Sequence, residues 1–378
     1  MTGPALAEQG LDNVLTLRDF EPLAAARIEA LAWAYLSSGA GDERSLSWNE
    51  QAWADIALVP RILQDVAQVS TEVQLLGSQL AHPILLAPAA AQAAFHAEGE
   101  LGTLRGAAAS GALYVQSTHG SIDVETVGRQ ARAPWWFQLY VQRDREFVAR
   151  LVDRAQAAGT TALVLTVDSP TGGRRDRDQR LYLRGQRPEN LPGHDKANYP
   201  NLIGLRRAPD GAPAHRRVYD AVLDPSLTWS DVEWLVARTS VPVLLKGLLR
   251  ADDVQRAIDS GAAGVIVSNH GARQVDTVVP TAAALPAIAT AAAGRLPVLV
   301  DGGIRRGTDV LKALCLGADG VMLGRPYLWA LGAFGGAGVA RAVDILRTEL
   351  EIAMCQVGAR SLAELTPDLL DVDGSVGT

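Results

Sequence analysis

The stretch GVIVSNHGARQVD, residues 264–276, joins an apolar run to a polar loop that contains glycine. The run Gly264–Val267 has the composition of a parallel strand that is buried on both faces. The loop after it carries His270 and Arg273. A histidine at a strand end is by itself usually an ordinary loop residue. Beside an arginine, which can bind a carboxylate through its fork of donors, it can accept a proton near neutral pH, so the pair predicts chemistry on an acid.

Short apolar runs of the same kind recur along the chain and alternate with amphipathic segments. The predicted strands are Pro83–Ala87, Ala112–Gln116, Trp135–Leu139, Ala162–Val167, Pro242–Lys246, Gly264–Ser268, Pro297–Asp301 and Gly320–Leu323. The predicted helices between them include Glu98–Ser110, Arg143–Ala158, Ala251–Ser260 and Gly307–Leu316. Alternation of strand and helix indicates a parallel sheet, and this number of repeats predicts an α/β fold of the (β/α)₈ TIM-barrel type.

Two segments lie outside this repeat. Residues 1–60 precede the first predicted strand, and Pro22–Ser37 is predicted to be helical within them. The interval between the predicted fourth and fifth strands is far longer than the others and is rich in Pro, Gly and Arg. We therefore expect a single domain, residues 1–378, with a lid insertion at residues 175–228 over the barrel mouth. A surface loop without a function is the alternative.

Composition narrows the class of protein. The chain has 35 Lys+Arg against 42 Asp+Glu, a net charge of −7, so neither nucleic acid nor an anionic membrane is an expected partner. Its two cysteines do not form a disulfide framework, which predicts a cytoplasmic location. The sequence shows no signal peptide, no uninterrupted apolar span and no pattern of metal ligands, so we expect no membrane anchor and no metal.

Polar and small residues stand where the predicted strands end, which is where barrels of this type have their active sites. They are Ala89, Ala90, Ser117, Gln138, Tyr140, Thr166, Asp168, Lys246, Ser268, His270, Arg273, Asp301, Arg305, Gly324 and Arg325. The last two predicted strands lead into the glycine-containing turns Asp301–Gly307 and Gly324–Arg325. Glycines allow backbone amides to approach a ligand, and the arginines add positive charge, so these turns predict a phosphate-bearing ligand.

On these motifs the chain resembles the FMN-dependent 2-hydroxy-acid oxidase and dehydrogenase family, which includes glycolate oxidase, lactate oxidase and mandelate dehydrogenase. The resemblance extends from Leu17 to Leu365, and Ser268–Asp276 is its most specific part. It implies FMN as the cofactor and oxidation of a 2-hydroxy acid to the 2-oxo acid. It also implies a homo-oligomer, either a homotetramer or an octamer.

The resemblance assigns roles to single residues. Those implied in catalysis are His270, Asp168, Tyr140 and Lys246. Those implied in substrate binding are Tyr35, Arg273, Arg175, Tyr140 and His119. Those implied in FMN binding are Ala89, Ala90, Ser117, Gln138, Thr166, Lys246, Ser268, Asp301, Gly302, Gly303, Arg305, Gly324 and Arg325.

The implied reaction has two halves. Tyr35 and Arg273 hold the substrate carboxylate, and His270, paired with Asp168, accepts a proton as two electrons pass to FMN. Lys246 lies beside the flavin ring, where a cation stabilises the reduced form. The sequence shows neither a haem-binding domain nor a membrane insertion in the long loop, so dioxygen, giving hydrogen peroxide, is the simplest acceptor. A quinone or a soluble carrier stays open.

Three positions bear on substrate size. Ala91 and Gly172 are smaller than the residues of many relatives, and His119 stands where glycolate-oxidising relatives have a bulky aromatic residue. Small groups widen a pocket, so we expect a substrate larger than glycolate, either mandelate-like or longer-chained. His119 is expected to be a polar wall residue and not a second base. The lid can refill the same volume.

Two other functions are compatible with the residues alone. A barrel isomerase or aldolase acting on a phosphorylated substrate would contain no flavin, and Lys246 would be its Schiff-base candidate. A flavin-binding scaffold without activity is the other possibility. It is disfavoured because the complete set of catalytic side chains is present.

Overall fold

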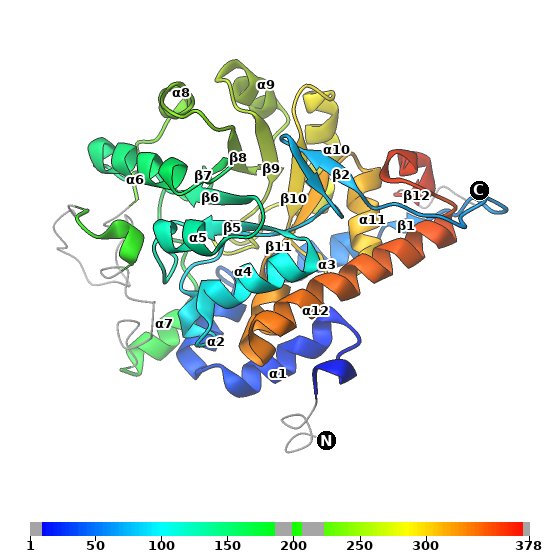
Figure 1. Ribbon diagram of the computed structural model, residues 1–378, viewed down its shortest axis with the longest axis horizontal. Helices are drawn as coiled ribbons and strands as arrows, with labels where there is room; N and C mark the ends of the chain where they lie inside the picture. The colour runs from blue at the N-terminus through cyan, green and yellow to red at the C-terminus, as the bar shows by residue number, and fades with distance from the viewer. Residues whose placement is uncertain (1–9, 186–198, 206–222, 373–378) are drawn as a thin grey trace.

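The computed structural model describes residues 10–185, 199–205 and 223–372. Their central feature is a closed barrel of parallel strands in the order β10-β11-β4-β5-β6-β7-β8-β9 (Figure 1). The strands are β4 (Ile84–Leu86), β5 (Leu113–Ser117), β6 (Trp135–Leu139), β7 (Leu163–Thr166), β8 (Val243–Leu248), β9 (Gly264–Val267), β10 (Val298–Asp301) and β11 (Gly320–Leu323). Each overlaps a predicted strand, and the predicted (β/α)₈ barrel is confirmed.

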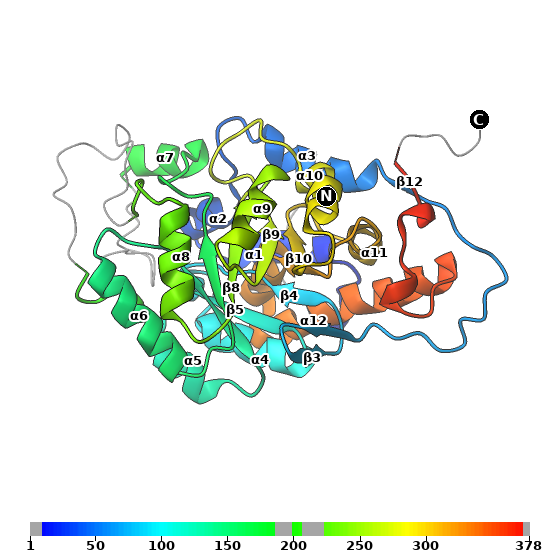
Figure 2. The ribbon, with the colours of Figure 1, turned by 90° about the horizontal axis from the view of Figure 1, so that it is seen from above.

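Helices follow the strands and surround the barrel, as Figures 1 and 2 show. They are α4 (Gly99–Ser110), α5 (Val124–Gln130), α6 (Arg145–Ala157), α8 (Trp229–Arg238), α9 (Asp252–Asp259), α10 (Thr281–Ala292), α11 (Gly307–Cys315) and α12 (Arg325–Val357). The strand residues are buried, apart from the half-buried Gly247 in β8, because one face packs against these helices and the other fills the barrel. The interior cluster includes Leu85, Val115, Trp136, Val164, Leu244, Ile266, Leu299 and Met322.

A short antiparallel hairpin precedes the barrel. It pairs β2 (Val73–Leu75) with β3 (Ser78–Leu80). Leu75 and Leu80 belong to the interior cluster of the barrel. Because the hairpin leads directly into β4, these side chains cover the end of the barrel where the strands begin. The active-site end is therefore the opposite one.

The segment before the barrel contains α1 (Phe20–Arg27), α2 (Ala30–Ser37) and α3 (Arg44–Ala54). The prediction that Pro22–Ser37 is helical is confirmed except at Ile28 and Glu29, where the backbone leaves the helical conformation. Ile28 is buried at this break. Packing of Ile28 in the core thus redirects the chain, and α2 can end close to the barrel mouth.

The last described strand pairs with the segment before the barrel. Strand β1 (Ala57–Leu58) pairs antiparallel with β12 (Leu370–Asp371). Helix α12 contains a kink at Phe334 and Gly335, where Gly335 adopts a φ of +62°. By length and composition α12 could cross a membrane, but 72% of its most apolar window is buried inside the protein. Such burial is typical of a core helix.

The interval between β7 and α8 is only partly described. It contains α7 (Asp176–Leu183) and a turn of 3₁₀-helix at Pro200–Leu202. Leu223 forms an isolated bridge with Gln142. The other residues of the predicted lid, 186–198 and 206–222, lie outside the described residues.

Candidate active site

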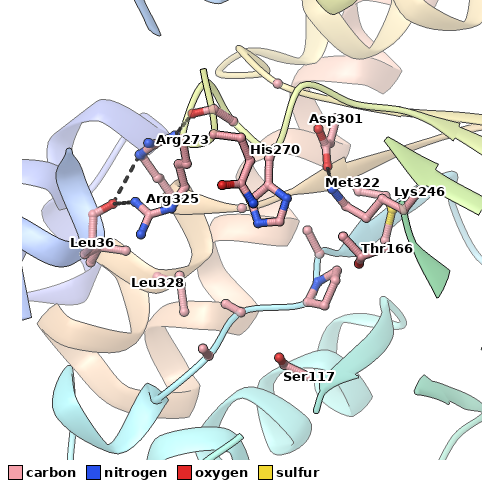
Figure 3. Close-up of a pocket in the computed structure, with 18 of the residues that line it drawn as sticks. Leu36, Ser117, Thr166, Lys246, His270, Arg273, Asp301, Met322, Arg325 and Leu328 are labelled. Atoms are coloured by element: carbon pink, nitrogen blue, oxygen red, sulfur yellow. Dashed lines mark hydrogen bonds and ion pairs between the residues drawn. The ribbon is translucent and has the colours of Figure 1, made fainter. Parts of the chain in front are cut away.

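A cavity of about 210 Å³ lies at the C-terminal ends of the barrel strands (Figure 3). Most of the predicted site residues line it: Tyr35, Ala89, Ala90, Ser117, His119, Gln138, Tyr140, Thr166, Arg175, Lys246, His270, Arg273, Asp301, Gly302, Gly303, Arg305, Gly324 and Arg325. Asp168 and Ser268 do not line it, but each bonds to a side chain that does. The structure therefore brings the predicted residues together in one site.

The loop after β9 presents His270 through an uncommon backbone turn. His270, Gly271 and Ala272 have φ values of +57°, +60° and +59°. Left-handed conformations are unfavourable for residues other than glycine, and such strain is commonly found at functional sites. The turn is held by Asn269, whose side-chain oxygen accepts a hydrogen bond from the Ala272 amide at 3.1 Å. The Ala40 amide donates to the Ala272 carbonyl at 2.8 Å.

His270 and Asp168 form a close pair. The Nδ1 atom of His270 lies 2.8 Å from Asp168 Oδ1. Burial acts to raise the pKa of Asp168, but His270 and then Lys246 outweigh it and hold that pKa below its ordinary value. Asp168 therefore stays ionised and accepts the Nδ1 proton, which leaves Nε2 of His270 as the acceptor atom. Tyr140 Oη lies 3.4 Å from Nε2, and burial raises the pKa of Tyr140.

Two arginines lie over the ring of Tyr35. The guanidinium carbons of Arg273 and Arg175 are 4.8 Å and 5.3 Å from its centroid. Nη1 of Arg273 donates to the carbonyl oxygens of Tyr35 at 2.8 Å and Ser38 at 3.0 Å. Burial lowers the pKa of Arg273, and the positive charge of Arg175 lowers it further. An anion bound here would stabilise the charged guanidinium of Arg273 and so oppose both of these effects on its pKa.

Lys246, the fourth residue of β8, pairs with Asp301 at the end of β10. Its Nζ lies 2.8 Å from Asp301 Oδ2 and donates to Ser268 Oγ at 2.6 Å. Burial acts to lower the pKa of Lys246, but Asp301 and Asp168 outweigh it and raise that pKa above its ordinary value. A Schiff-base lysine must lose its proton to act as a nucleophile. The ion pair therefore disfavours an aldolase function.

A row of polar side chains crosses the cavity floor. Gln138 donates from Nε2 to Thr166 Oγ1 at 2.9 Å and accepts from Ser117 Oγ at 3.1 Å. All three residues are buried. Hydrogen-bonded amides and hydroxyls of this kind can bind the polar edge of a planar ring system, which is the role that the resemblance implies.

The turns after β10 and β11 fit a phosphate-bearing cofactor. Gly302 and Gly303 have φ values of +97° and +83°, and a Cβ atom at Gly324 would meet nothing within 4 Å. Asp301 Oδ1 and Arg305 Nε are buried without a hydrogen-bond partner among the described residues. Buried polar atoms normally have partners, so a ligand with polar groups is expected to meet them. The residues present therefore fit the FMN that the resemblance implies.

Arg325 is held by three backbone carbonyl oxygens. It donates to Gly271 at 2.9 Å, Leu36 at 3.2 Å and Ser38 at 2.8 Å. Figure 3 shows Arg273 and Arg325 both directed at Leu36. A guanidinium has five N–H donors, so two of those on Arg325 are not used by these contacts. Burial lowers the pKa of Arg325, and other arginines nearby lower it further.

Carboxylate partners are distributed unevenly among the cations of the site. The pairs are Lys246–Asp301, His270–Asp168, Arg175–Asp178 and Arg305–Glu50, at 2.7–2.8 Å. Neither Arg273 nor Arg325 pairs with a carboxylate among the described residues. Both donate to backbone carbonyls, and Arg273 also lies over the ring of Tyr35. A buried charge without a counterion is costly, so the arrangement favours the binding of two anionic groups.

Aromatic side chains form one wall of the cavity. The ring of His119 stacks on Tyr140 at 4.9 Å and on Tyr199 at 5.1 Å. Gly172 lines the cavity, as expected. Ala91 does not line it, so the expectation that Ala91 widens the pocket was wrong. Its side chain is buried in the core between barrel and helices, because the left-handed backbone at Ala91, with a φ of +55°, turns the chain away from the cavity.

Several lining residues were missed from the sequence. Leu46 and Asn49 reach the cavity from α3. Asn49 exchanges hydrogen bonds with the side chain of Asn269 at 2.8–2.9 Å. The spacing of Leu46, Asn49 and Trp53 along one helical face was an available signal for burial. No local pattern marks Tyr199 or Leu223, which belong to the long interval before α8.

Comparisons with known proteins agree with this site. The family model described as FMN-dependent dehydrogenase matches residues 24–372. The chain is 43% identical over 370 residues to a peroxisomal (S)-2-hydroxy-acid oxidase of Oryza sativa subsp. japonica, covering 96% of this chain and 98% of that protein. It is 41% identical to L-lactate oxidase of Nostoc sp., covering 95% and 99%. A solved structure of mandelate oxidase with (S)-2-phenylpropionate matches with a TM-score of 0.83 and 38% identity, covering 95% and 98%.

These comparisons correct the predicted location. The rice relatives are named as peroxisomal enzymes, which contradicts the cytoplasmic location that was predicted from the two cysteines. Both cysteines are free thiols in the structure. Free thiols therefore do not identify the compartment.

Three findings lead to one assignment. The chain is more than 40% identical to a relative over nearly its whole length, the family model matches nearly all of its residues, and the cavity fits the cofactor. The chain belongs to the FMN-dependent 2-hydroxy-acid oxidase and dehydrogenase family, and it is an oxidoreductase whose cofactor is FMN.

Proposed function

We propose that the protein oxidises a 2-hydroxy acid larger than glycolate to the 2-oxo acid and passes the electrons to dioxygen, which leaves as hydrogen peroxide. The observation that carries this proposal is the pair of partly buried guanidiniums, Arg273 and Arg325, that have no carboxylate partner among the described residues. One matches the carboxylate of the substrate, and the other matches the phosphate of the cofactor.

The substrate carboxylate binds to Arg273, with Tyr35 beneath the guanidinium and Arg175 nearby. This contact fixes the acid in one orientation and removes much of the entropic barrier to reaction. His270 Nε2 accepts the proton of the substrate hydroxyl, because Asp168 keeps the other ring nitrogen protonated. Tyr140 lies within hydrogen-bond reach of the same atom and orients the hydroxyl.

The glycine turns after β10 and β11, with Arg305 and Arg325, would hold the phosphate of FMN. Gln138, Thr166 and Lys246 would contact its ring, together with the small residues Ala89 and Ala90. Bound there, FMN would supply an acceptor for the α-hydrogen of the substrate and its two electrons. The Lys246 ammonium would stabilise the negative charge of the reduced ring.

Two observations support the substrate and the acceptor. Gly172 leaves one side of the cavity without a side chain, and His119 with Tyr199 gives the wall an aromatic character suited to an aryl or long-chain acid. The relatives from rice and Nostoc are named oxidases, and one of the matching solved structures is a mandelate oxidase. These names favour dioxygen over a quinone or carrier. We further propose that the described part of the predicted lid, residues 175–185, 199–205 and 223–228, covers the site and that the chain forms a homo-oligomer.

Reduction of the enzyme by its substrate tests the proposal. The purified protein should be yellow, and a mandelate-like acid should bleach it without oxygen faster than glycolate does. Readmitted dioxygen should yield one hydrogen peroxide per 2-oxo acid. A colourless protein, or a yellow protein that no 2-hydroxy acid bleaches, would contradict the function. Bleaching without peroxide would contradict only the choice of acceptor.

Two variants separate chemistry from binding. His270→Ala should bind FMN and substrate normally but lose several orders of magnitude in the rate of flavin reduction, because the proton acceptor is gone. Arg273→Lys should raise KM as well, because an ammonium group cannot form the bidentate contact to a carboxylate. Rapid-mixing absorbance measurements give both quantities. A wild-type reduction rate in either variant would show that its role is misassigned.

A further inference from the structure

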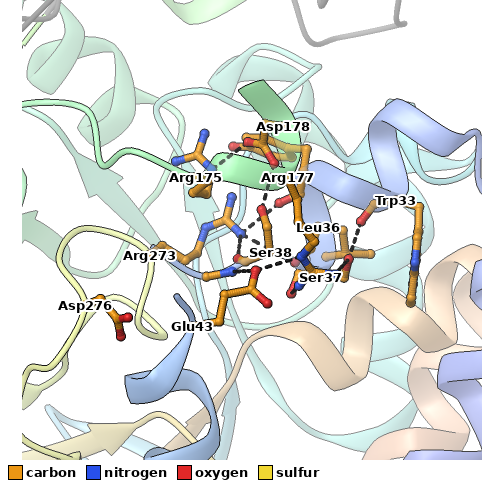
Figure 4. Close-up of polar contacts among 12 residues, drawn as sticks. Trp33, Leu36, Ser37, Ser38, Glu43, Arg175, Arg177, Asp178, Arg273 and Asp276 are labelled. Atoms are coloured by element: carbon orange, nitrogen blue, oxygen red, sulfur yellow. Dashed lines mark hydrogen bonds and ion pairs between the residues drawn. The ribbon is translucent and has the colours of Figure 1, made fainter. Parts of the chain in front are cut away.

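The beginning of α7 is bound to the end of α2 beside the substrate site (Figure 4). Asp178 lies at the centre of these contacts and is only 1% exposed. It accepts hydrogen bonds from Arg175 Nε at 2.7 Å and from Ser38 Oγ at 2.7 Å. Arg177 lies beside it and donates to Glu43 Oε1 at 2.7 Å and to the Ser37 carbonyl at 2.8 Å.

Asp178 faces one member of a pair of cations. Arg175 and Arg273 both lie over the ring of Tyr35 and both line the cavity. Arg175 pairs with Asp178, whereas Arg273 has no carboxylate partner among the described residues and donates to the backbone carbonyls of Tyr35 and Ser38. The two guanidiniums and one carboxylate therefore leave a single positive charge at this end of the cavity.

Because these side chains are largely buried, the balance between their charges strongly affects the potential in the cavity. The carboxylate of Asp178 and the guanidinium of Arg175 are 1% and 21% exposed. Water screens such charges poorly, so removing one of them changes the potential in the cavity by far more than removing a surface charge does. The fixed position of Asp178, between Arg175 and Ser38, also keeps Arg175 directed at α7.

We propose that Asp178 is a positioning residue that restricts the substrate cavity to acids with a single carboxylate. It neutralises Arg175 and leaves Arg273 as the cation available to a substrate anion. The proposal rests on the proposed function, because it takes the Arg273 end of the cavity as the carboxylate site. Without the charge of Asp178 this end would carry two cations and would favour a ligand with two negative charges.

Two inhibitors of equal size provide the test. Oxalate and oxamate differ by one negative charge, since oxamate has an amide in place of one carboxylate. The dissociation constant of each is measured on the oxidised, FMN-loaded enzyme from the change in flavin absorbance. The ratio of the oxamate constant to the oxalate constant reports how strongly the cavity prefers a dianion. General loosening of the site would weaken both ligands and leave this ratio unchanged.

The charge-removing variant is Asp178→Asn, which keeps the shape of the side chain. The ratio should rise about tenfold or more, as expected for one unit charge within roughly 10 Å at an effective dielectric constant of about 20. Asp176→Asn is the matched control on the same helix. Its carboxylate pairs with Arg174, which is 76% exposed, and the ratio should change less than about twofold because water screens this pair. A ratio in Asp178→Asn that falls or stays within twofold of wild type would overturn the proposal.

A second variant keeps the test decisive if Asp178→Asn does not fold. Arg175→Gln leaves Asp178 as an extra negative charge, so the same ratio should fall. A ratio that rises or stays constant in Arg175→Gln would also overturn the proposal. Failure of the proposed function looks different, because the wild-type enzyme would then bind neither inhibitor. If the wild-type enzyme binds the inhibitors but the ratio does not respond in the variants, only the role proposed for Asp178 is contradicted.

Discussion

Replacement of Asp168 by asparagine should slow flavin reduction without weakening substrate binding. The substitution keeps the shape of the side chain and removes the negative charge that lies 2.8 Å from His270 Nδ1. It also puts an amide nitrogen at one of the two oxygen positions. The Oδ2 position has no hydrogen-bond partner among the described residues, so an NH₂ group there would remain unsatisfied.

The size of the effect follows from the contact. A hydrogen bond to a charged group contributes about 1.5–3 kcal/mol. As His270 takes up a proton it becomes a cation, and the full value of the charged contact is felt only then. At about 1.4 kcal/mol per factor of ten, the reduction rate should fall about 10- to 150-fold.

Anaerobic rapid mixing with a 2-hydroxy acid measures both quantities. The limiting rate of flavin bleaching should fall in Asp168→Asn, while the acid concentration that gives half of that rate should stay close to wild type. Ser169→Ala is the control, because Ser169 Oγ donates to Asp168 Oδ1 at 3.0 Å but carries no charge. Its effect should be smaller than that of Asp168→Asn, because the Asp168 carboxylate keeps its charge in Ser169→Ala. A wild-type limiting rate in Asp168→Asn, or a change in half-saturation alone, would refute the assignment of Asp168 to proton transfer.

Three further outcomes are expected. Arg325→Ala should weaken FMN binding by about 1.5–3 kcal/mol in a flavin fluorescence titration, since a charged donor is lost, and equal affinities would contradict the phosphate assignment. Gly172→Leu should reduce kcat/KM for mandelate-like acids by about 1–3 kcal/mol while sparing glycolate, and equal losses for both would show that another segment sets substrate size. The pKa of Asp168 is held low in the folded protein, so its stabilising contribution is present above the unfolded pKa of about 3.9 and is lost as the pH falls through the folded pKa. Urea unfolding should therefore show a gap between wild type and Asp168→Asn at pH 7 that closes on acidification, and a gap independent of pH would contradict this linkage.

The barrel was predictable because its signals are local. An apolar run such as Gly264–Val267 reads as a buried strand without knowledge of its neighbours. The turn at Asp301–Gly307 shows its glycines and arginines in consecutive positions. Barrel topology then places the strand ends together, so the predicted site residues converge on one cavity.

The features that were not predicted depend on distant partners. The break at Ile28 arises from packing against the core, and Ala91 turns away from the cavity through a left-handed backbone that alanine rarely adopts. Asp178 stands in a run of alternating charges that reads as an exposed loop. Only the folded chain shows that Ser38, far away in the sequence, covers it.

The carbonyl oxygen of Ser38 has a consequence for how the two ligands affect each other. It accepts hydrogen bonds from Arg273 at 3.0 Å and from Arg325 at 2.8 Å, one from each anion site. If a bound phosphate moves Arg325 away from this oxygen, Arg273 no longer shares it with Arg325. The remaining hydrogen bond then holds Arg273 more rigidly. If the phosphate in this way raises the affinity of Arg273 for a carboxylate, thermodynamic reciprocity requires that a bound carboxylate raises the affinity for the cofactor by the same factor. Turnover would in this way protect the enzyme from losing its flavin, and the apoprotein would bind acids poorly.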